Sequence, residues 1–468
     1  MRDFLVAALR ARRQQPTLIA LSLPAPPLFL EPLWDALPAE PAMLWDAPAA
    51  ADAMSGTACL GLGAVEMPPT AAQPGDPGAS STSIPVEKIA PPGHAAAALR
   101  WFSGGSFAGA VAEPPWTDFP AALKTLPRWC YTDGPDGCRL QLCVYAPSDA
   151  VIAQVAAEYE ALRQAGARPL AERAPAPQRP LRSEPLPYVR WQQWIEQILQ
   201  AIAARQVDKV VAVRRSTLWF AQPIDVAAVL GRLRAQAPQS IRFAWRRGAA
   251  TFLGATPELL LRKRGRIITT DALAGTLPRR DAPLHELCAQ LLASDKDRRE
   301  HAPVVAAIKQ RLLPLCRDIT APESPQIRVL PHLLHMYTPI QATTRSAATC
   351  VTDLVSALHP TPAVGGNPTA KALQLIAELE PQPRGYYAGP LGFYDEHGDG
   401  EFAVAIRSGV VIGNTAYVYG GAGIVQGSDP ALEYAETAAK MRTFLSALGV
   451  PGEPSEQTAR AESDPVPR

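Results

Sequence analysis

The sequence predicts a mixed α/β protein, of the α/β or α+β class, because strand patterns and helix patterns both occur along its 468 residues. Residues 401–406 alternate between two sets of side chains, which is typical of a strand. Within residues 191–204, apolar side chains recur at helical spacing, and residues 208–215 then change to strand character. We therefore expect sheets and helices together in one core.

Length and composition limit the class of protein. A chain of this length corresponds to roughly two to four domains, although large single folds also reach this size. Hydrophobic residues make up 47% of the chain, which is enough for a sizeable core. The formal net charge is +1, so no basic field favours nucleic acid or an anionic membrane as a partner. No apolar run reaches the roughly 18 residues of a membrane span, and the N-terminus is too short in apolar run for a signal peptide.

The cysteines indicate a reducing compartment. Seven are present, and none forms a CxxC pair. An odd number without such pairs argues against a disulfide framework. We therefore expect a cytoplasmic protein.

Proline-rich stretches divide the chain. Residues 66–94 are rich in Pro, Gly, Ser and Ala and are predicted to form a mobile loop or insertion. Residues 173–187 form a second Pro-rich connector, and residues 451–468 are predicted to be a disordered tail. We expect an N-terminal part, 1–185, followed by a main region, 190–447.

The stretch from 359 to 442 holds the densest set of motifs. Loops fixed by proline and glycine alternate with a helix, a hairpin and a closing helix. Gly413-Asn414 suits a tight hairpin turn. In the glycine-rich segment 420–423, the missing side chains let the backbone approach a ligand closely.

Charged residues in this stretch occupy positions that the patterns place inward. Arg407 shares a strand face with two alanines, which leave room beside it for a ligand. Glu433, Glu436 and Lys440 are three and four residues apart and therefore line one face of the closing helix. Two carboxylates and an amine that face an arginine indicate an anionic substrate with a metal. The alternative is a solvated helix face.

Two residues outside this stretch have the character of a base and an acid. Lys209 begins a strand and shares a face with two valines, and desolvation there would lower the pKa of an amine towards the general-base range. The alternative is an edge lysine whose ammonium lies in water. Glu258 follows a turn just before an apolar run, so it is either a partly buried acid with a raised pKa or a strand-end carboxylate.

Two further segments offer groups to a ligand. Residues 271–276 end in a small-residue turn that can present backbone N–H groups to an anion. Ser294 with Asp297 resembles a capping box, and Glu300 then lies on the apolar face of the helix that follows. A buried carboxylate usually has a partner or a metal.

The histidines do not form a zinc motif. His332 and His335 are three residues apart, but they lack the HExxH context and follow a strand-like segment. His301 is expected to be structural rather than a ligand.

Together, these segments resemble the isochorismate synthases of the chorismate-utilising family. The resemblance covers roughly residues 190–447 in family order, and weaker similarity extends upstream. The matching segments are Asp208-Lys-Val-Val, Gly254-Ala-Thr-Pro-Glu-Leu-Leu-Leu-Arg, Ala272-Leu-Ala-Gly-Thr, Lys296-Asp-Arg-Arg-Glu-His, His335-Met-Tyr-Thr-Pro-Ile and nearly all of residues 359–442.

The resemblance implies a single large domain, in which packed, mainly antiparallel β-sheets are flanked by helices and enclose the active site. It implies a Mg²⁺-dependent isomerase that converts chorismate to isochorismate, by adding water at ring carbon 2 and losing the hydroxyl of carbon 4. Chorismate would be the small-molecule partner, in menaquinone or siderophore biosynthesis or on the route to salicylate. We expect a monomer with no nucleic-acid or membrane partner.

The resemblance also implies roles for individual residues. Lys209 is the expected base that deprotonates water, and Glu258 is the expected acid that protonates the leaving hydroxyl. Glu300 and Glu436, with Glu433 nearby, are the expected ligands of Mg²⁺, which prefers hard oxygen atoms. The expected clamp on the enolpyruvyl carboxylate is Tyr387 with Arg407, and the other expected substrate-pocket residues are Gly275, Thr276, His359, Gly421 and Lys440.

Details of the motifs favour water over ammonia as the nucleophile. Aminating relatives do not usually keep the lysine matched by Lys209, and they typically show Gly-Ala-Pro-Lys where this chain has Gly365-Gly-Asn-Pro. Aminodeoxychorismate synthases resemble Pro-Ile-Lys-Gly-Thr where this chain has Ala272-Leu-Ala-Gly-Thr. Salicylate synthases, which also eliminate pyruvate, keep the lysine and form the alternative function. A non-catalytic chorismate-binding protein would have lost the base, the acid or a metal carboxylate, and the chain keeps all of them.

Overall fold

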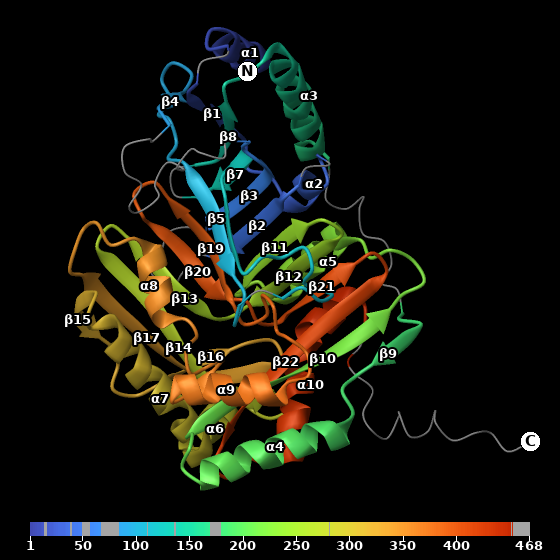
Figure 1. The fold of residues 1–468 in the computed structure, drawn as a ribbon, viewed down its shortest axis with the longest axis vertical. Coiled ribbons are helices and arrows are strands. Elements are labelled where there is room, and N and C mark those ends of the chain that lie inside the picture. The colour runs from blue at the N-terminus through green and yellow to red at the C-terminus, as the bar shows by residue number, and fades with distance from the viewer. Residues whose placement is uncertain are drawn as a thin grey trace, which may run out of the picture.

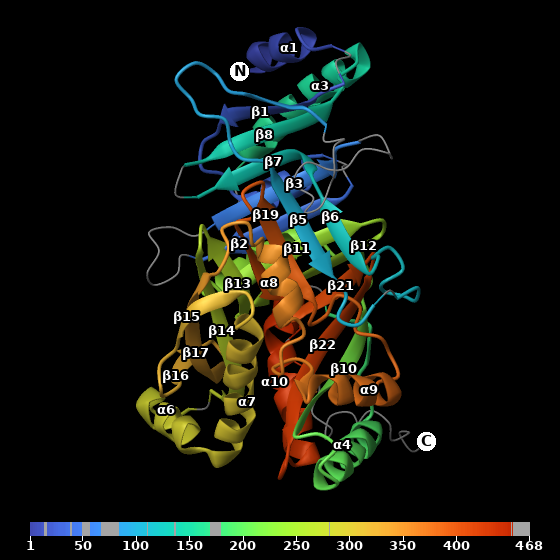
Figure 2. The ribbon, with the colours of Figure 1, turned by 60° about the vertical axis from the view of Figure 1, so that its left-hand side comes forward.

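Two large β-sheets pack against each other, and helices flank them (Figure 1, Figure 2). One parallel pair lies at an edge of the larger sheet, and the other described strand pairs are antiparallel. The computed structural model describes residues 1–13, 16–37, 40–48, 57–66, 84–109, 111–134, 137–168, 179–279, 281–450 and 452.

The larger sheet has thirteen described strands, drawn from the whole length of the chain. Their order is β18 (Gly366–Asn367), β10 (Lys209–Trp219), β22 (Thr415–Val425), β21 (Ser408–Ile412), β12 (Ala250–Thr256), β11 (Ile241–Arg247), β2 (Ala42–Ala47), β3 (Thr57–Ala64), β7 (Pro127–Asp133), β8 (Arg139–Tyr145), β1 (Leu18–Pro24) and β4 (Val86–Ile89), with β9 (Arg182–Glu184) also paired to β10.

The second sheet has nine described strands. Their order is β15 (Cys316–Thr320), β17 (Leu333–Thr344), β14 (Ile267–Pro278), β13 (Leu259–Arg264), β20 (Gly400–Val404), β19 (Pro390–Asp395), β5 (Arg100–Gly105) and β6 (Ala122–Thr125), with β16 (Gln326–Val329) also paired to β17.

Helices pack on both sheets. None of the described helices combines the length and the apolar character that crossing a membrane requires. All seven cysteines are free. The helices are α1 (Arg2–Arg10), α2 (Leu30–Trp34), α3 (Asp149–Gly166), α4 (Tyr188–Ala203), α5 (Val226–Gln236), α6 (Leu284–Ala293), α7 (Asp295–Leu312), α8 (Val351–Leu358), α9 (Thr369–Leu379) and α10 (Pro430–Leu448). In Figure 1, α4, α6, α7 and α9 lie at the lower end of the molecule, whereas α1 and α3 lie at the upper end.

Several local predictions are confirmed. The helical pattern of 191–204 is α4, and the strand that begins at Lys209 is β10. The two strands around the turn before Glu258 are β12 and β13. Gly413-Asn414 forms the turn between β21 and β22, where Gly413 has a φ of +55° that glycine adopts without strain.

The predicted strand through Arg407 is wrong in its second half. β20 ends at Val404, and the next strand, β21, belongs to the other sheet. Between them Arg407 has a φ of +54°, so strand alternation no longer decides where its side chain points. The hairpin at Gly413-Asn414 is therefore formed by β21 and β22, not by the strand that precedes Arg407.

The N-terminal part shares both sheets with the rest of the chain. β2 pairs with β11 in the larger sheet, and β5 pairs with β19 in the second. Much of the predicted insertion at 66–94 lies outside the described residues, but β4 pairs with β1 and thus makes its end part of the sheet. The predicted tail, 451–468, lies outside the described residues except for Gly452.

Aromatic side chains fill the space between the sheets. Trp116 is fully buried, stacks on Tyr386 and donates its indole N–H to the Tyr419 hydroxyl at 3.1 Å. Gly385 has a φ of +53°, and a Cβ at this position would lie 2.2 Å from the Trp116 ring. Glycine therefore lets the chain turn directly over the indole, and this turn leads to Tyr387.

Arg242 on β11 joins the two parts of the chain, and its replacement should destabilise the fold. The buried guanidinium donates to Glu31 of α2 at 2.5 Å and to Asp46 of β2 at 3.0 Å. We predict that Arg242→Met lowers the free energy of unfolding by about 3–5 kcal/mol, because buried Glu31 loses its main partner. Urea denaturation would measure this loss. Adding Glu31→Gln should recover part of it, and a loss below about 1 kcal/mol would contradict the assignment.

Candidate active site

The two sheets enclose a polar cavity between β10 and β22 on one side and β14 and β17 on the other. Its free volume is only about 60 Å³, and charged side chains form much of its wall. The described residues that line it are Val211, Val213, Glu258, Leu273, Ala274, Thr276, Glu300, His335, Ala363, Val364, Arg384, Tyr387, Ala388, Ile406, Arg407, Gly421, Gly423 and Lys440.

Lys209 lies at the start of β10 and is buried beside this cavity. Val211 and Val213, two and four residues further along the strand, line the cavity, as the predicted alternation requires. The Lys209 ammonium lies 3.1 Å from Oε1 of Glu300, yet it makes no hydrogen bond of good geometry with a described residue. A buried ammonium with unused donors is costly unless it serves a ligand. The alternative of an edge lysine in water is therefore wrong.

Gly423 makes room for this ion pair. It lies on β22 opposite Val211, and a Cβ at this position would come within 2.3 Å of the Glu300 carboxylate and 2.9 Å of Lys209 Cε. The glycine-rich segment was expected to admit a ligand. Here the missing side chain admits the Lys209–Glu300 pair itself.

Glu258 lies where the chain crosses from the larger sheet to the second. Thr256 fixes this crossing, since its hydroxyl donates to the Val404 carbonyl at 2.7 Å and accepts from the Glu258 N–H at 3.2 Å. Burial raises the pKa of the Glu258 carboxyl to about 7, although the positive charge of Lys209 opposes the rise. The carboxyl therefore keeps a substantial proton population near neutral pH, as a general acid requires.

Glu300 on α7 has the opposite protonation state. Burial alone would raise the pKa of its carboxyl, but the charges of Lys209 and Lys440 outweigh burial and lower that pKa. Glu300 is thus a buried carboxylate that stays ionised. One face of the cavity holds a proton donor, and another holds a fixed negative charge.

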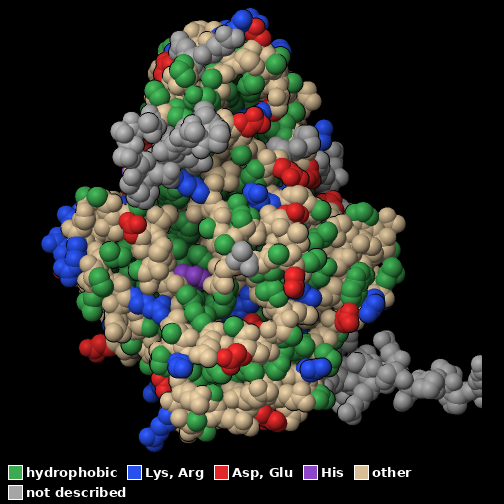
Figure 3. Space-filling model, in the orientation of Figure 1, with side chains coloured by type: hydrophobic (Ala, Val, Ile, Leu, Met, Phe, Trp, Pro, Cys, Tyr) green, Lys and Arg blue, Asp and Glu red, His purple; other side chains and the backbone are tan. Residues whose placement is uncertain are grey.

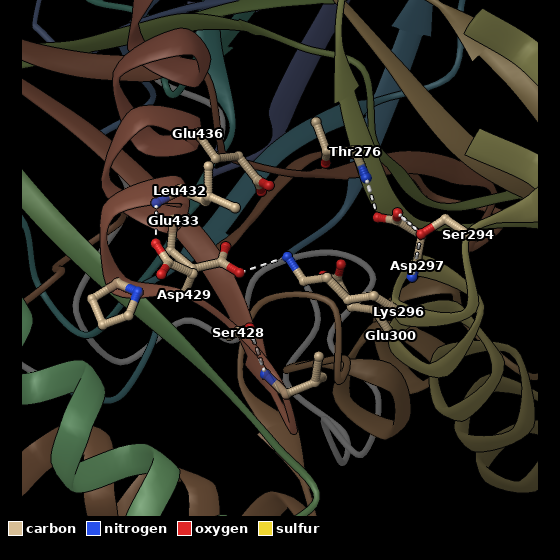
Figure 4. A network of polar contacts seen from close by, with 12 residues as sticks. Thr276, Ser294, Lys296, Asp297, Glu300, Ser428, Asp429, Leu432, Glu433 and Glu436 are labelled. Atoms are coloured by element: carbon tan, nitrogen blue, oxygen red, sulfur yellow. Dashed lines mark hydrogen bonds and ion pairs between the residues drawn. The ribbon is translucent and has the colours of Figure 1, made fainter. Parts of the chain in front are cut away.

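Two further carboxylates on α10 lie near Glu300 (Figure 4). Glu436 pairs with Lys440 at 2.5 Å, and the buried Glu433 pairs with Lys296 of α7 at 2.6 Å. Burial and repulsion from Glu436 raise the pKa of the Glu433 carboxyl, although Lys296 opposes the rise. The face of α10 that carries Glu433 and Glu436 therefore lies towards α7, and the alternative of a solvated helix face is wrong.

These carboxylates suit Mg²⁺ by donor chemistry. They are hard oxygen ligands on two facing helices, and the repulsion between Glu433 and Glu436 is one that a cation would relieve. Among the described residues, no three side chains of metal-ligating type converge closely enough to form a ready-made ion site. Lysine ammonium groups instead contact each carboxylate. The residues fit the ion, and the lysine contacts would have to adjust to its arrival.

Arg407 is held in the cavity wall by a histidine. Its Nη2 donates to His335 Nε2 at 2.8 Å, so the other ring nitrogen, Nδ1, carries the proton of the neutral imidazole. Nδ1 lies 3.1 Å from the Thr276 hydroxyl and 3.4 Å from the Gly275 carbonyl. Burial and the charge of Arg407 lower the pKa of His335 well below its usual range, which keeps the ring neutral.

Tyr387 completes this side of the cavity. Its ring stacks on Tyr419 with centroids 5.0 Å apart. Burial raises the pKa of the Tyr387 phenol to about 12, although the charge of Arg407 opposes the rise. The hydroxyl thus stays protonated and can donate to an anion.

The predicted turn at Gly275-Thr276 already holds an anion. Gly275 has a φ of +82°, and the Thr276 N–H donates to the Asp297 carboxylate at 3.1 Å. Asp297 also accepts from the Ser294 hydroxyl at 2.5 Å, and the predicted helix cap at Ser294 is confirmed (Figure 4). The Thr276 side chain, rather than its N–H, is therefore available to the cavity.

His359 lies apart from the other predicted residues. It is not among the described residues that line the cavity, and its ring packs edge-on against Phe107. Gly421, in contrast, lines the cavity, and its carbonyl accepts from Lys440 at 3.1 Å. The predicted pocket residue His359 thus stands behind the wall in this structure.

Sequence reasoning assigned no role to three residues that the fold brings to the site. His335 was considered only as a possible zinc ligand, although its position opposite Thr276 follows from the β14–β17 register. Lys296 reaches Glu433, which is 137 residues away in sequence. Arg384 lies within the matched stretch 359–442, and no role was predicted for it. The contacts of His335 with Arg407, of Lys296 with Glu433 and of Arg384 with the Val211 carbonyl each join distant elements, so no local pattern could reveal them.

His301 bonds through both ring nitrogens, to the Ala274 carbonyl and the Thr338 hydroxyl.

The raised pKa of Glu258 predicts a pH-dependent stability. Its folded pKa of about 7 exceeds the ordinary value of 4.5, so ionisation weakens the folded state as pH rises from about 4.5 to 7. We expect Glu258→Gln, which cannot ionise, to be more stable than the parent at pH 8 by about 3 kcal/mol, and nearly equal to it at pH 4.5. Urea denaturation of both proteins at the two pH values measures this. A constant difference across pH would show that Glu258 titrates normally.

Comparison with known proteins identifies the family of this fold and cavity. The sequence model of the family described as "Chorismate binding enzyme" matches residues 9–449. Isochorismate synthase MenF of Bacillus subtilis is 39% identical over 261 residues, which cover 55% of this chain and 55% of that protein. A salicylate biosynthesis isochorismate synthase of Pseudomonas aeruginosa is 40% identical over 268 residues, which cover 56% and 55%. The match thus spans just over half the length of these relatives.

Solved structures show the same architecture. The menaquinone-specific isochorismate synthase MenF of Escherichia coli superposes with a TM-score of 0.74 and 28% identity, over 94% of this chain and 98% of that one. The structure of a putative 2,3-dihydroxybenzoate-specific isochorismate synthase, DhbC from Bacillus anthracis, gives a TM-score of 0.65 at 24% identity, over 90% of this chain and all of that one, and supports the fold alone. The matched family model covers nearly the whole chain and both sheets that enclose the cavity, and the chain therefore belongs to the chorismate-binding enzyme family.

Proposed function

We propose that this protein is an isochorismate synthase, an isomerase that moves the ring hydroxyl of chorismate from carbon 4 to carbon 2. The observation that carries the proposal is the arrangement of two groups at one cavity: Glu258, whose carboxyl has a pKa of about 7, and the buried Lys209 beside the ionised Glu300. Relatives that carry this activity in their names support it.

The chemistry assigns one proton transfer to each group. Water adds at carbon 2 and must lose a proton, which Lys209, as the neutral amine, takes as the general base and so becomes an ammonium. The hydroxyl of carbon 4 leaves as water when Glu258 gives it a proton. Atoms balance, because one water enters and one leaves. In the reverse reaction the two residues exchange roles.

Carboxylates of the substrate need fixed positive charge. Arg407 is anchored by His335, so its guanidinium is oriented before a ligand arrives, and Tyr387 adds a hydroxyl donor on the same side. We assign these two residues to the enolpyruvyl carboxylate. Thr276, Gly421 and Lys440 form the remaining wall, and we assign Gly275 and His359 to its support.

Glu300 and Glu436 are the proposed ligands of Mg²⁺, with Glu433 nearby. When bound, the ion would neutralise the ring carboxylate of chorismate and fix its position. The proposed enzyme is a cytoplasmic monomer.

Water is favoured over ammonia by residues rather than by the fold, which aminating relatives share. The lysine is present at Lys209, the strand that lines the cavity has Ala274, and Gly365-Gly366 stand next to β10. A salicylate synthase, which would also eliminate pyruvate, remains the second candidate. The name of the Pseudomonas aeruginosa relative places that enzyme in salicylate biosynthesis as an isochorismate synthase.

Product analysis tests the proposal directly. Purified protein incubated with chorismate and Mg²⁺ should form isochorismate, and chelation by EDTA should stop turnover until Mg²⁺ is restored. Chromatography separates the possible products. Adding ammonia should change nothing. Anthranilate or aminodeoxychorismate would refute water as the nucleophile, and salicylate with pyruvate as the main products would establish the second candidate.

Lys209→Ala separates the base from the rest of the site. We expect turnover to fall by ~10²–10⁴ in both directions, because a positioned base is lost, while chorismate still binds through Arg407 and Tyr387. Lys263→Ala is a matched control, since this lysine is also buried in a strand but pairs with Asp399, away from the cavity. Near-normal turnover in either direction for Lys209→Ala would remove Lys209 from the mechanism.

A further inference from the structure

Another buried ion pair lies at the wall of the cavity. Glu380, at the end of α9, and Arg384, in the turn that follows, form two contacts of 2.8 and 2.5 Å. Arg384 is 4% exposed and itself lines the cavity. Neither side chain has a place in the proton transfers proposed above. A buried pair of this kind is expensive to desolvate, so its contacts with the surroundings decide what it does.

The pair completes an unpaired edge of β10. One edge of β10 pairs with β18 at Lys209 and Val210 and with β9 from Thr217 onward. Along residues 211–216, no described strand pairs with this edge. There the Val211 carbonyl accepts from Arg384 at 2.7 Å, and the Val213 N–H donates to Glu380 at 2.9 Å. Guanidinium and carboxylate thus replace the backbone groups of a missing strand.

The same guanidinium also holds the loop that precedes β18. Arg384 donates to the Val364 carbonyl at 2.8 Å and lies over the Phe107 ring at 4.2 Å. Its own carbonyl accepts from the Tyr387 N–H at 3.0 Å, in the turn that carries Tyr387 into the cavity. One residue therefore fixes two separate parts of the site: the strand that bears Lys209, and the turn that bears Tyr387.

We propose that Glu380 and Arg384 are positioning residues, which set the distance between the Lys209 strand and the Tyr387 turn by completing the open edge of β10. Neither transfers a proton. Their effect on turnover rests on the proposed function, whereas their effect on the β10 edge does not. Small displacements at such a site are costly, because a misplaced reacting group can lower the rate by about 10²-fold.

Arg311 provides a matched control. It lies on α7 and donates to the Leu358 and Pro360 carbonyls at 2.7 and 2.6 Å. It thus holds the loop before Val364 with the same chemistry, but its hydrogen bonds to the described residues do not reach β10, and it does not line the cavity. Arg311→Met should cost stability without opening the β10 edge.

The experiment compares Arg384→Met, Arg384→Lys, Glu380→Gln and Arg311→Met with the parent, at a temperature at which all are folded. Hydrogen exchange of the peptide that covers 209–219 should rise at least about tenfold for Arg384→Met and stay at the parent rate for Arg311→Met. With chorismate and Mg²⁺, kcat should fall about 10- to 100-fold for Arg384→Met, with a smaller change in KM. Arg384→Lys keeps a donor and Glu380→Gln keeps an acceptor. The exchange rate and kcat of these two variants should therefore lie between those of the parent and those of Arg384→Met.

The outcomes separate the inference from the proposed function. If exchange at 209–219 is faster in Arg384→Met than in the parent, but the parent does not turn over chorismate, the proposed function is refuted and the positioning role is kept. Unchanged exchange in Arg384→Met, or a loss of kcat as large in Arg311→Met, would overturn the positioning role. If Arg384→Met does not fold, Arg384→Lys decides, since its ammonium keeps the charge beside Glu380 but cannot reproduce the bonds of the planar guanidinium to both the Val211 and the Val364 carbonyls. Normal exchange with normal kcat in Arg384→Lys would then overturn the inference.

Discussion

Charges buried between two sheets must be paired, and the rest of this site follows from that requirement. Lys209 with Glu300 joins β10 to α7, and Lys296 with Glu433 joins α7 to α10. Removing one partner would leave the other in a low-dielectric interior, at a cost of several kcal/mol. The contacts that hold these elements together are thus the same contacts that set the charges of the cavity. On the face seen in Figure 3, basic and acidic side chains are in contrast interspersed, as expected of a nearly neutral surface.

Side chains also form hydrogen bonds with backbone groups that no described strand pairs with. The guanidinium groups of Arg311 and Arg384 bind carbonyls of the loop between α8 and β18, where no described strand could pair with them. Each planar guanidinium satisfies several acceptors at once, which lysine could not do with the same geometry. The loop beside the cavity is consequently held by a few directional bonds and not by a ladder.

Local sequence patterns predicted those structural features that are determined by residues close together in the chain. α4, the face of β10 and the turn at Gly413 follow from periodicity and glycine, and each is confirmed. Contacts between distant residues could not be predicted in this way. His335 reaches Arg407 only because the order of strands places β17 and the end of β20 on the same side of the cavity.

The resemblance to a family supplied candidate residues that periodicity could not supply, but it did not predict where each residue lies or where each strand ends. Three of the residues that it named, Glu258, Glu300 and Arg407, line one cavity in the structure. The resemblance could not show that β20 stops at Val404, because the alternation of side chains continues past the point where the pairing partner ends. The alternation describes one strand, whereas the end of a strand is decided by the neighbours with which it pairs.

The two places where the chain crosses between the sheets lie side by side. The Val404 N–H donates to the Glu258 carbonyl at 3.1 Å, and the Ala255 N–H donates to the Arg407 carbonyl at 3.3 Å. These bonds form a seam along which the sheets are joined by the chain itself. If the sheets separate to admit a molecule larger than the narrow cavity, groups on this seam move least, and groups on α7 and α10 move most. The distance between Glu258 and Arg407 would then change little when the sheets separate, whereas the carboxylates on α7 and α10 would change position.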